Sequence, residues 1–231
     1  MMLRELVSVF GSSDPLRLMG DNFSRMLKLT NELNLTASKL FFTEIQGDGE
    51  SERKLLWDGD VEVNKLEQTI RRQIITHLSV PGNEADVPYC LLLMSLVKDV
   101  ERLGDYAKNL SEITKIHPGP IPLGRLFDGL LSIRRGTENI FAALPGVFES
   151  AAYDEALERI RAGRRNSLQC ERFIAEVGGS VMDAATTAAL ILGARYYKRT
   201  NGHLLNVYSG VVVPLDKVDY FDDSSVVQSY A

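Results

Sequence analysis

Prolines divide this chain into long segments and restrict its fold more than any other feature of the sequence. They stand at positions 15, 81, 88, 118, 120, 122, 145 and 214. A proline inside a helix costs about 3 kcal/mol, because it lacks an amide donor and clashes with the preceding turn. The long intervals between the prolines are therefore candidate helices.

Apolar residues in these intervals recur every three or four positions, as they do on one face of an α-helix. Phe23, Met26, Leu33 and Phe41 belong to the first such series. The fold class predicted from this pattern is all-α, with six helices. Their expected ranges are 16 to about 41, 51–79, 87–116, 126–148, 153–177 and 183–213. We expect the fourth to be interrupted near Pro145.

The order of three helices, a linker and three helices indicates an internal duplication. His117–Pro122 contains three prolines and a glycine, a composition that favours a stiff, extended connector. We predict a first repeat with an N-terminal extension at residues 1–117, a proline-rich linker at 118–122 and a second repeat at 123–231. In the extension, the amphipathic segment Leu3–Phe10 is expected to pack on its own bundle, and the alternative is that it docks on a partner.

Composition and charge exclude several classes of protein. The formal net charge is −5 and the pI about 5.3, so the basic excess of a nucleic-acid binder is missing. Cys90 and Cys170 are the only cysteines, which argues against a disulfide framework and fits a reducing compartment. Met1–Phe10 is a poor signal peptide, and no apolar run is long enough to span a membrane. We expect a soluble cytosolic protein.

Two carboxylates lie one helical turn apart in the stretch Lys98–Asn109. A helix places Glu101 and Asp105 on the same face, where like charges repel by a few tenths of a kcal/mol unless a cation lies between them. Asp60 and Asn64 have the same spacing in the preceding helix. If the two helices are antiparallel neighbours, the four oxygen-bearing side chains can face one another and form a metal site.

The acidic stretch also has an explanation that needs no metal. Lys98, Arg102 and Lys108 surround the two carboxylates, and such a cluster is usually a solvated, ion-paired face. Both explanations stay open on the residues alone. If a metal does bind, oxygen donors without histidine or thiolate suit Mg²⁺, Mn²⁺ or Ca²⁺.

The second repeat does not keep the carboxylates. A shift of 97 residues superimposes part of the third predicted helix on the sixth and aligns Arg102 with Arg199. Lys198 and Gly202 then take the positions of the two carboxylates. We therefore expect at most one metal site, in the N-terminal half.

Basic side chains replace acidic ones in the second repeat. Arginine forks suit phosphate or an acidic partner surface, which makes five residues candidate anion or partner contacts. They are Arg161, Arg164, Arg165, Lys198 and Arg199. The alternative is a solvated basic face that pairs with the nearby Glu155 and Glu158.

Two motifs carry a family resemblance. Asp58–Ile70, followed by Lys98–Asn109, resembles the paired signature of the PhoU family, the regulators of phosphate uptake. The segments Ala194–Arg199 and Val211–Phe221 fit the second repeat of that family. The resemblance implies two tandem three-helix bundles, a cytoplasmic location, and association with a phosphate transporter ATPase and a sensor histidine kinase. It also implies multinuclear metal sites built from E/D-x-x-x-D motifs.

Residue by residue, the resemblance implies a metal site at Asp60, Asn64, Glu101 and Asp105. Asn64 stands where many members have a second aspartate, which lowers the charge of the site but keeps an oxygen ligand. The family suggests iron or zinc, whereas the oxygen donors suit magnesium or manganese, so the identity of the metal stays open. Formation of a homodimer stays open too.

We expect a non-enzymatic regulator or adaptor of phosphate uptake and phosphate-responsive signalling, with metal bound in the first repeat. The alternative function is a metal-free helical adaptor or scaffold without a phosphate role. Two enzyme classes fit less well, because the sequence lacks the Glu-x-x-His motifs of di-iron bundles and the Gly-x-Ser-x-Gly elbow of hydrolases.

Overall fold

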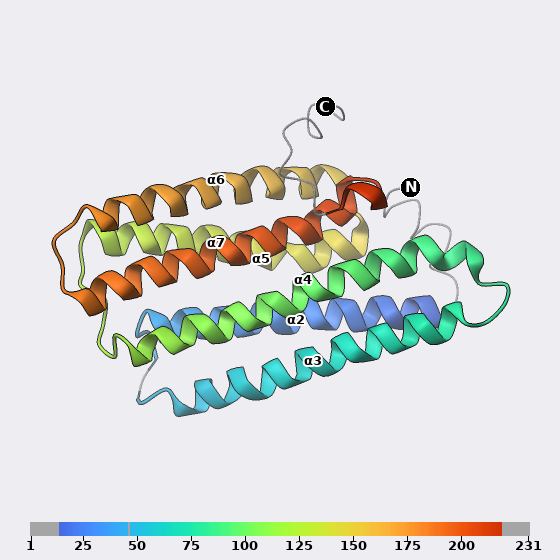
Figure 1. The fold of residues 1–231 in the computed structure, drawn as a ribbon, viewed down its shortest axis with the longest axis horizontal. Coiled ribbons are helices and arrows are strands. Elements are labelled where there is room, and N and C mark those ends of the chain that lie inside the picture. The colour runs from blue at the N-terminus through green and yellow to red at the C-terminus, as the bar shows by residue number, and fades with distance from the viewer. Residues whose placement is uncertain (1–13, 46, 219–231) are drawn as a thin grey trace.

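The computed structural model describes residues 14–45 and 47–218, and within them it contains six long α-helices and no strand (Figure 1). The all-α prediction is confirmed. In chain order the helices are α2 (Asp14–Phe41), α3 (Glu50–Leu78), α4 (Val87–Glu112), α5 (Arg125–Ser150), α6 (Tyr153–Gly178) and α7 (Ala184–Val212). Short 3₁₀ turns η1 (Glu84–Asp86), η2 (Ile113–Lys115) and η3 (Leu215–Lys217) extend the connections.

The predicted interruption near Pro145 is wrong, because α5 continues through this proline to Ser150. Burial explains why the helix persists. Phe141 and Leu144 before the proline and Val147 after it are all buried in the core. The packing of this continuous apolar face outweighs the cost of about 3 kcal/mol that proline imposes on a helix.

The helices form two three-helix bundles that lie side by side. α2, α3 and α4 contact one another in the first bundle, and α5, α6 and α7 in the second. Figure 1 shows α3 and α6 at opposite edges of the molecule, with the other helices between them. Across the boundary, α2 packs on α5 and α4 packs on α7, and one cluster of buried apolar residues runs through both bundles. The division into two domains at residues 118–122 stays a prediction.

The second bundle approaches the first closely at Gly193 of α7. A Cβ atom at this position would lie 2.7 Å from Cζ of Phe41, which is closer than carbon atoms pack. One turn later, the hydroxyl of Tyr197 lies 2.9 Å from Oγ of Ser38, and both side chains are fully buried. Gly193 lets α7 approach α2 closely, and the hydrogen bond between Tyr197 and Ser38 holds the two helices together.

An ion pair joins the bundles beside this contact. Arg134 of α5 donates two hydrogen bonds to the carboxylate of Glu44, which follows α2, with lengths of 2.5 and 2.9 Å. A third bond of 2.7 Å runs to Glu138. Because Arg134 is buried and its charge is fully paired, removing either carboxylate would leave a poorly compensated cation in the interface.

Parts of the sequence prediction fall outside the described residues. Leu3–Phe10, predicted to pack on its own bundle, is one of them, and residues 219–231 at the end of the second repeat are another. Among the helices that are described, none is long and apolar enough to cross a membrane.

Candidate metal and anion sites

The predicted carboxylates lie on two neighbouring helices. α3 and α4 pack against each other and run in opposite directions (Figure 1), as the metal hypothesis requires. Lys108 of α4 bridges them. Its Nζ atom lies 2.8 Å from Oδ2 of Asp60 on α3 and 3.8 Å from Oδ1 of Asp105 on α4. The fold thus brings two of the four predicted ligands to one cation.

The other predicted ligands have partners on their own helices. Nζ of Lys98 lies 2.8 Å from Oε2 of Glu101, and Nη1 of Arg102 lies 2.9 Å from Oδ2 of Asp105. Asn64 donates its amide to the backbone carbonyl of Asp60 at 3.0 Å. Amide donation of this kind leaves the side-chain oxygen of Asn64 available as an acceptor.

Burial makes the charges of this group interact strongly. The side chains of Asp60 and Glu101 are only 14% and 12% exposed. Burial lowers the pKa of Lys108, but the hydrogen bond to Asp60 and the charges of Asp60 and Asp105 outweigh it and raise the pKa above its ordinary value. Lys108 is therefore a firm cation at neutral pH, placed between two carboxylates.

The donor chemistry suits a hard divalent cation, since three carboxylates and an amide oxygen are ligands that such ions prefer. In the described part of the chain, however, no three acidic, histidine or cysteine side chains already converge on one point. A metal at this position would have to displace the ammonium group of Lys108 and draw Glu101 away from Lys98.

The five basic residues of the second repeat do not share one environment. Nζ of Lys198 lies 2.5 Å from Oε1 of Glu171 on α6. Arg199 turns toward α4, where its Nε donates to the hydroxyl of Tyr106 at 2.8 Å. The three arginines lie on α6, with Arg161 and Arg165 exposed and Arg164 half-buried.

The pairing of this basic face with Glu155 and Glu158 also stays a prediction. Glu155 accepts a hydrogen bond of 3.2 Å from Arg159 on its own helix. The carboxylate that pairs with Lys198 belongs to Glu171. Anion binding by the five residues stays a prediction.

Comparison with a family model identifies the first bundle. The model described as the PhoU domain matches residues 16–114, which include α2, α3 and α4 almost completely. Residues 16–114 match the PhoU domain. The family resemblance drawn from two motifs is thereby confirmed. A search of curated proteins found no match.

Two solved structures share the fold of the PhoU domain and of the bundle that follows it. The phosphate transport system regulatory protein PhoU from Streptococcus pneumoniae superimposes with a TM-score of 0.75 at 15% identity, covering 87% of this chain and 94% of that one. PhoU from Pseudomonas aeruginosa gives 0.76 at 16% identity, with 85% and 95% covered. At such low identity the likeness shows the fold.

A polar cluster joins the PhoU domain to the second bundle, and the sequence analysis missed it. Asp99 of α4 is buried and accepts hydrogen bonds from His203 and Asn206 of α7. The rings of Tyr106 and His203 lie 5.4 Å apart. The sequence did contain a signal for these positions, because the shift of 97 residues that aligns the two repeats also aligns Tyr106 with His203.

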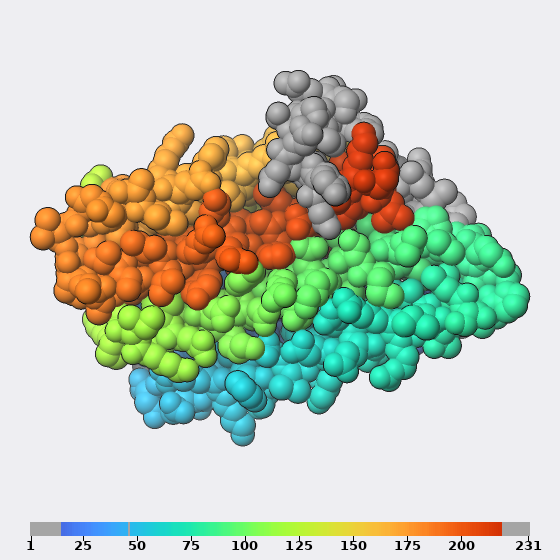
Figure 2. All heavy atoms as spheres, viewed as in Figure 1, coloured from blue at the N-terminus to red at the C-terminus, as the bar shows by residue number. Residues whose placement is uncertain are grey.

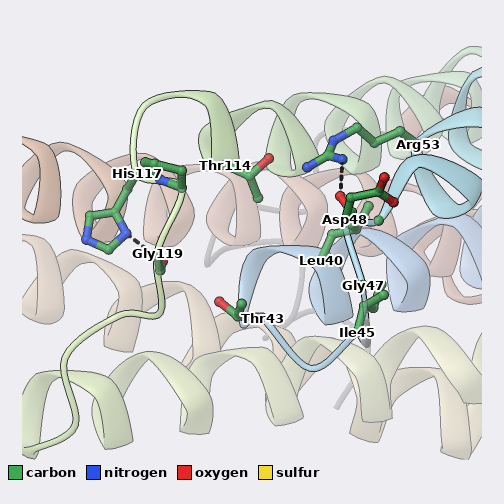
Figure 3. A pocket seen from close by; sticks show the side chains of 11 residues that line it. Leu40, Thr43, Ile45, Gly47, Asp48, Arg53, Thr114, His117 and Gly119 are labelled. Atoms are coloured by element: carbon green, nitrogen blue, oxygen red, sulfur yellow. Dashed lines mark hydrogen bonds between the residues drawn. The ribbon is translucent and has the colours of Figure 1, made fainter.

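A small cavity lies at one end of the PhoU domain, between the α2–α3 turn and the proline-rich linker (Figure 3). Its volume is about 120 Å³, and it contains none of the predicted site residues. Arg53 donates to the carbonyl of Asp48 at 2.5 Å and also contacts Glu50. His117 bonds to the carbonyl of Gly119. The charged side chain of Arg53 and the ring of His117 therefore already have hydrogen-bond partners, and neither needs a ligand in the cavity.

Proposed function

We propose that the chain is a non-enzymatic adaptor that regulates phosphate uptake and phosphate-responsive signalling. One observation carries the proposal: the first bundle matches the PhoU domain, and the whole six-helix arrangement matches that of a protein named as a phosphate transport system regulator. The proposal includes a cytoplasmic location and two partners, a phosphate transporter ATPase and a sensor histidine kinase.

The outer helix of the PhoU domain offers a surface for such partners. Trp57 is the only tryptophan of the chain and is 65% exposed, and Ile75 on the same helix is 62% exposed. Val61, one turn after Trp57, is exposed as well. Tryptophan is strongly enriched among the residues that dominate protein–protein binding energies. A solvent-facing tryptophan on an edge helix therefore supports binding to another protein.

We further propose that this adaptor binds a metal ion through Asp60, Asn64, Glu101 and Asp105. The support is the oxygen chemistry of these side chains and their position on two antiparallel, adjacent helices. A bound divalent ion would link α3 to α4 more strongly than the single charge of Lys108 does. Iron, zinc, magnesium and manganese remain candidates.

A second candidate function is a metal-free helical adaptor. The ion pairs favour it, because Lys108, Lys98 and Arg102 already neutralise Asp60, Glu101 and Asp105. In that case the acidic face is a structural contact between α3 and α4.

Co-purification tests the regulatory role. The tagged full-length chain is isolated from cells grown with ample phosphate, and its partners are identified by mass spectrometry. We expect a transporter ATPase or a histidine kinase, and substitution of Trp57 by alanine should reduce its recovery. The matched control is Leu18→Ala, which removes a similarly exposed apolar side chain from α2. Recovery of neither class of partner with the unmutated chain contradicts the proposed function.

A further inference from the structure

At the boundary between α4 and α7, three side chains of α7 surround one aromatic ring of α4. Tyr106 is buried on α4. The guanidinium carbon of Arg199 lies 5.1 Å from the centre of its ring, and the ring centres of His203 and Tyr196 lie 5.4 and 6.3 Å away. Positions 196, 199 and 203 share one face of α7. We call Tyr106, Arg199 and His203 the seam cluster.

Asp99 fixes the orientation of His203 in the seam cluster. Its Oδ1 atom lies 2.7 Å from Nδ1 of His203 and 2.8 Å from Nδ2 of Asn206. A carboxylate only accepts hydrogen bonds, so Nδ1 of His203 carries the proton of this contact. Nε2, on the other side of the ring, has no hydrogen-bond partner within residues 14–45 and 47–218.

Arg199 and Tyr106 add further donors. Nε of Arg199 donates to the phenolic oxygen of Tyr106 at 2.8 Å, which leaves the phenolic hydrogen of Tyr106 available. The two terminal nitrogens of Arg199 have no partner among the described residues, and the side chain is exposed to solvent. Asp99, the carboxylate bonded to His203, already accepts two hydrogen bonds. The seam cluster is therefore rich in unused donors.

We propose that the seam cluster binds a tetrahedral oxyanion, and that this anion is inorganic phosphate. The planar fork of Arg199 can donate two parallel hydrogen bonds to such an anion. Tyr106 can donate to another of its oxygens, and Nε2 of His203 can form a hydrogen bond with an oxygen or a hydroxyl of the phosphate. The choice of phosphate rests on the proposed function.

The position of the seam cluster gives the anion a structural effect. α4 belongs to the PhoU domain and α7 to the second bundle, and Figure 2 shows their surfaces adjoining on one face of the molecule. An anion held by Tyr106 on one side and by Arg199 and His203 on the other would tie the two bundles together. Because it binds only the folded protein, phosphate should also raise the thermal unfolding midpoint.

Titration calorimetry of the purified full-length chain with inorganic phosphate tests the inference. We expect measurable binding, weakened about tenfold or more in Arg199→Gln, since hydrogen bonds to charged groups are strong. Tyr106→Phe, which keeps the ring but removes the hydroxyl, should weaken binding severalfold. The matched control is Arg172→Gln, which removes the same charge from an exposed site on α6 outside the five candidate anion contacts and should change affinity by no more than about twofold.

Three results overturn the inference. One is the absence of binding up to about 10 mM phosphate, a concentration at which even weak millimolar sites fill. Another is an equal loss of affinity in Arg199→Gln and Arg172→Gln, which would mean that phosphate is attracted by the overall charge of the protein. The third is binding of sulfate as tight as that of phosphate, which removes the assignment to phosphate. Circular dichroism and the unfolding midpoint without phosphate show that each variant is folded.

The calorimetry uses no partner protein, so its outcome is separate from that of the co-purification. A chain that recovers its partners but binds no phosphate leaves the regulatory function standing and overturns the seam site. A chain that binds phosphate through Arg199 but recovers no partner leaves the seam site standing and overturns the proposed regulatory function.

Discussion

Lys108 occupies the point on which a metal ion would bind between α3 and α4. Its ammonium group lies 2.8 Å from Oδ2 of Asp60 and 3.8 Å from Oδ1 of Asp105, so it is the cation that these two carboxylates share. A divalent ion interacts twice as strongly with each carboxylate at equal distance, but it must first displace Lys108. A metal ion bound at the proposed site would therefore compete with Lys108 for the same oxygens.

This competition predicts how metal content responds to substitution. The chain purified without chelator should retain metal after dialysis, and Glu101→Ala with Asp105→Ala should remove it, because two ligands are lost. Lys108→Gln should instead strengthen metal binding severalfold by removing the competing cation. Elemental analysis of each protein provides the measurement.

The control for the metal experiment is a double variant that removes two exposed carboxylates from α6, Asp154→Ala with Glu158→Ala. It should keep the metal content of the unmutated chain. If neither the unmutated protein nor Lys108→Gln retains metal, the site does not exist and the metal-free adaptor remains.

The sequence could predict which acidic residues lie near each other, but not how they pair. Helical spacing and the assumption of antiparallel neighbours suffice to bring Asp60 near Asp105. The bridge by Lys108 depends on the rotamer of a long side chain against a second helix, which spacing does not specify. Asn64 donates its amide to the backbone carbonyl of Asp60, a local bond that helical spacing does not predict.

At the scale of helices, periodicity predicted nearly all of the secondary structure because the apolar stripes are long and regular. Pro145 is the exception. A local rule ends a helix there, but Leu144 and Val147 are both buried, and tertiary packing overrode the local preference. The missing information was the surrounding bundle, which a single segment does not contain.

The close approach of α7 to α2 yields a prediction at this scale. Gly193→Ala should lower the free energy of unfolding by about 1–3 kcal/mol, because the added methyl group overlaps the buried ring of Phe41. Gly202→Ala on the same helix should stabilise by up to about 1 kcal/mol, since nothing lies within 4 Å of the added atom and alanine favours the helix. Urea unfolding curves measure both changes.

The opposite signs make the pair of glycine variants a strict comparison. Both variants replace glycine by alanine in the same helix, so a difference between their unfolding free energies cannot come from helix propensity. An unchanged or raised unfolding free energy for Gly193→Ala would mean that Phe41 can move aside without cost.

At the scale of the whole molecule, the sequence predicted two bundles but not how they join. The contacts that join them are distant in the chain, as between Ser38 and Tyr197, or between Glu44 and Arg134. No short-range pattern encodes such pairs. The alignment of Arg102 with Arg199 did indicate two related halves, and related halves commonly pack about an approximate two-fold axis. The structure was needed to show that α4 and α7 pack against each other where the two bundles meet.

One continuous core predicts a single cooperative unfolding transition, and buried tyrosines predict its pH dependence. Burial raises the pKa of Tyr89 to about 12 and raises the pKa of Tyr197 and Tyr208 above the ordinary value as well. Their contribution to stability is complete below the unfolded pKa of about 10 and is lost as the pH rises through the folded values. Each group should then cost about 1.4 kcal/mol per pH unit above pH 10.

Scanning calorimetry between neutral pH and pH 11 tests both statements. The expected result is one transition at every pH, with equal calorimetric and van't Hoff enthalpies, and a midpoint that falls above about pH 10. Tyr197→Phe should lower the midpoint at neutral pH, because it removes the hydrogen bond to Ser38. Above about pH 10, the midpoint of this variant should fall less steeply than that of the unmutated protein, because one titrating group is gone. Two separate transitions would show that the bundles unfold independently, and an unchanged alkaline slope in Tyr197→Phe would show that this tyrosine does not resist ionisation in the folded chain.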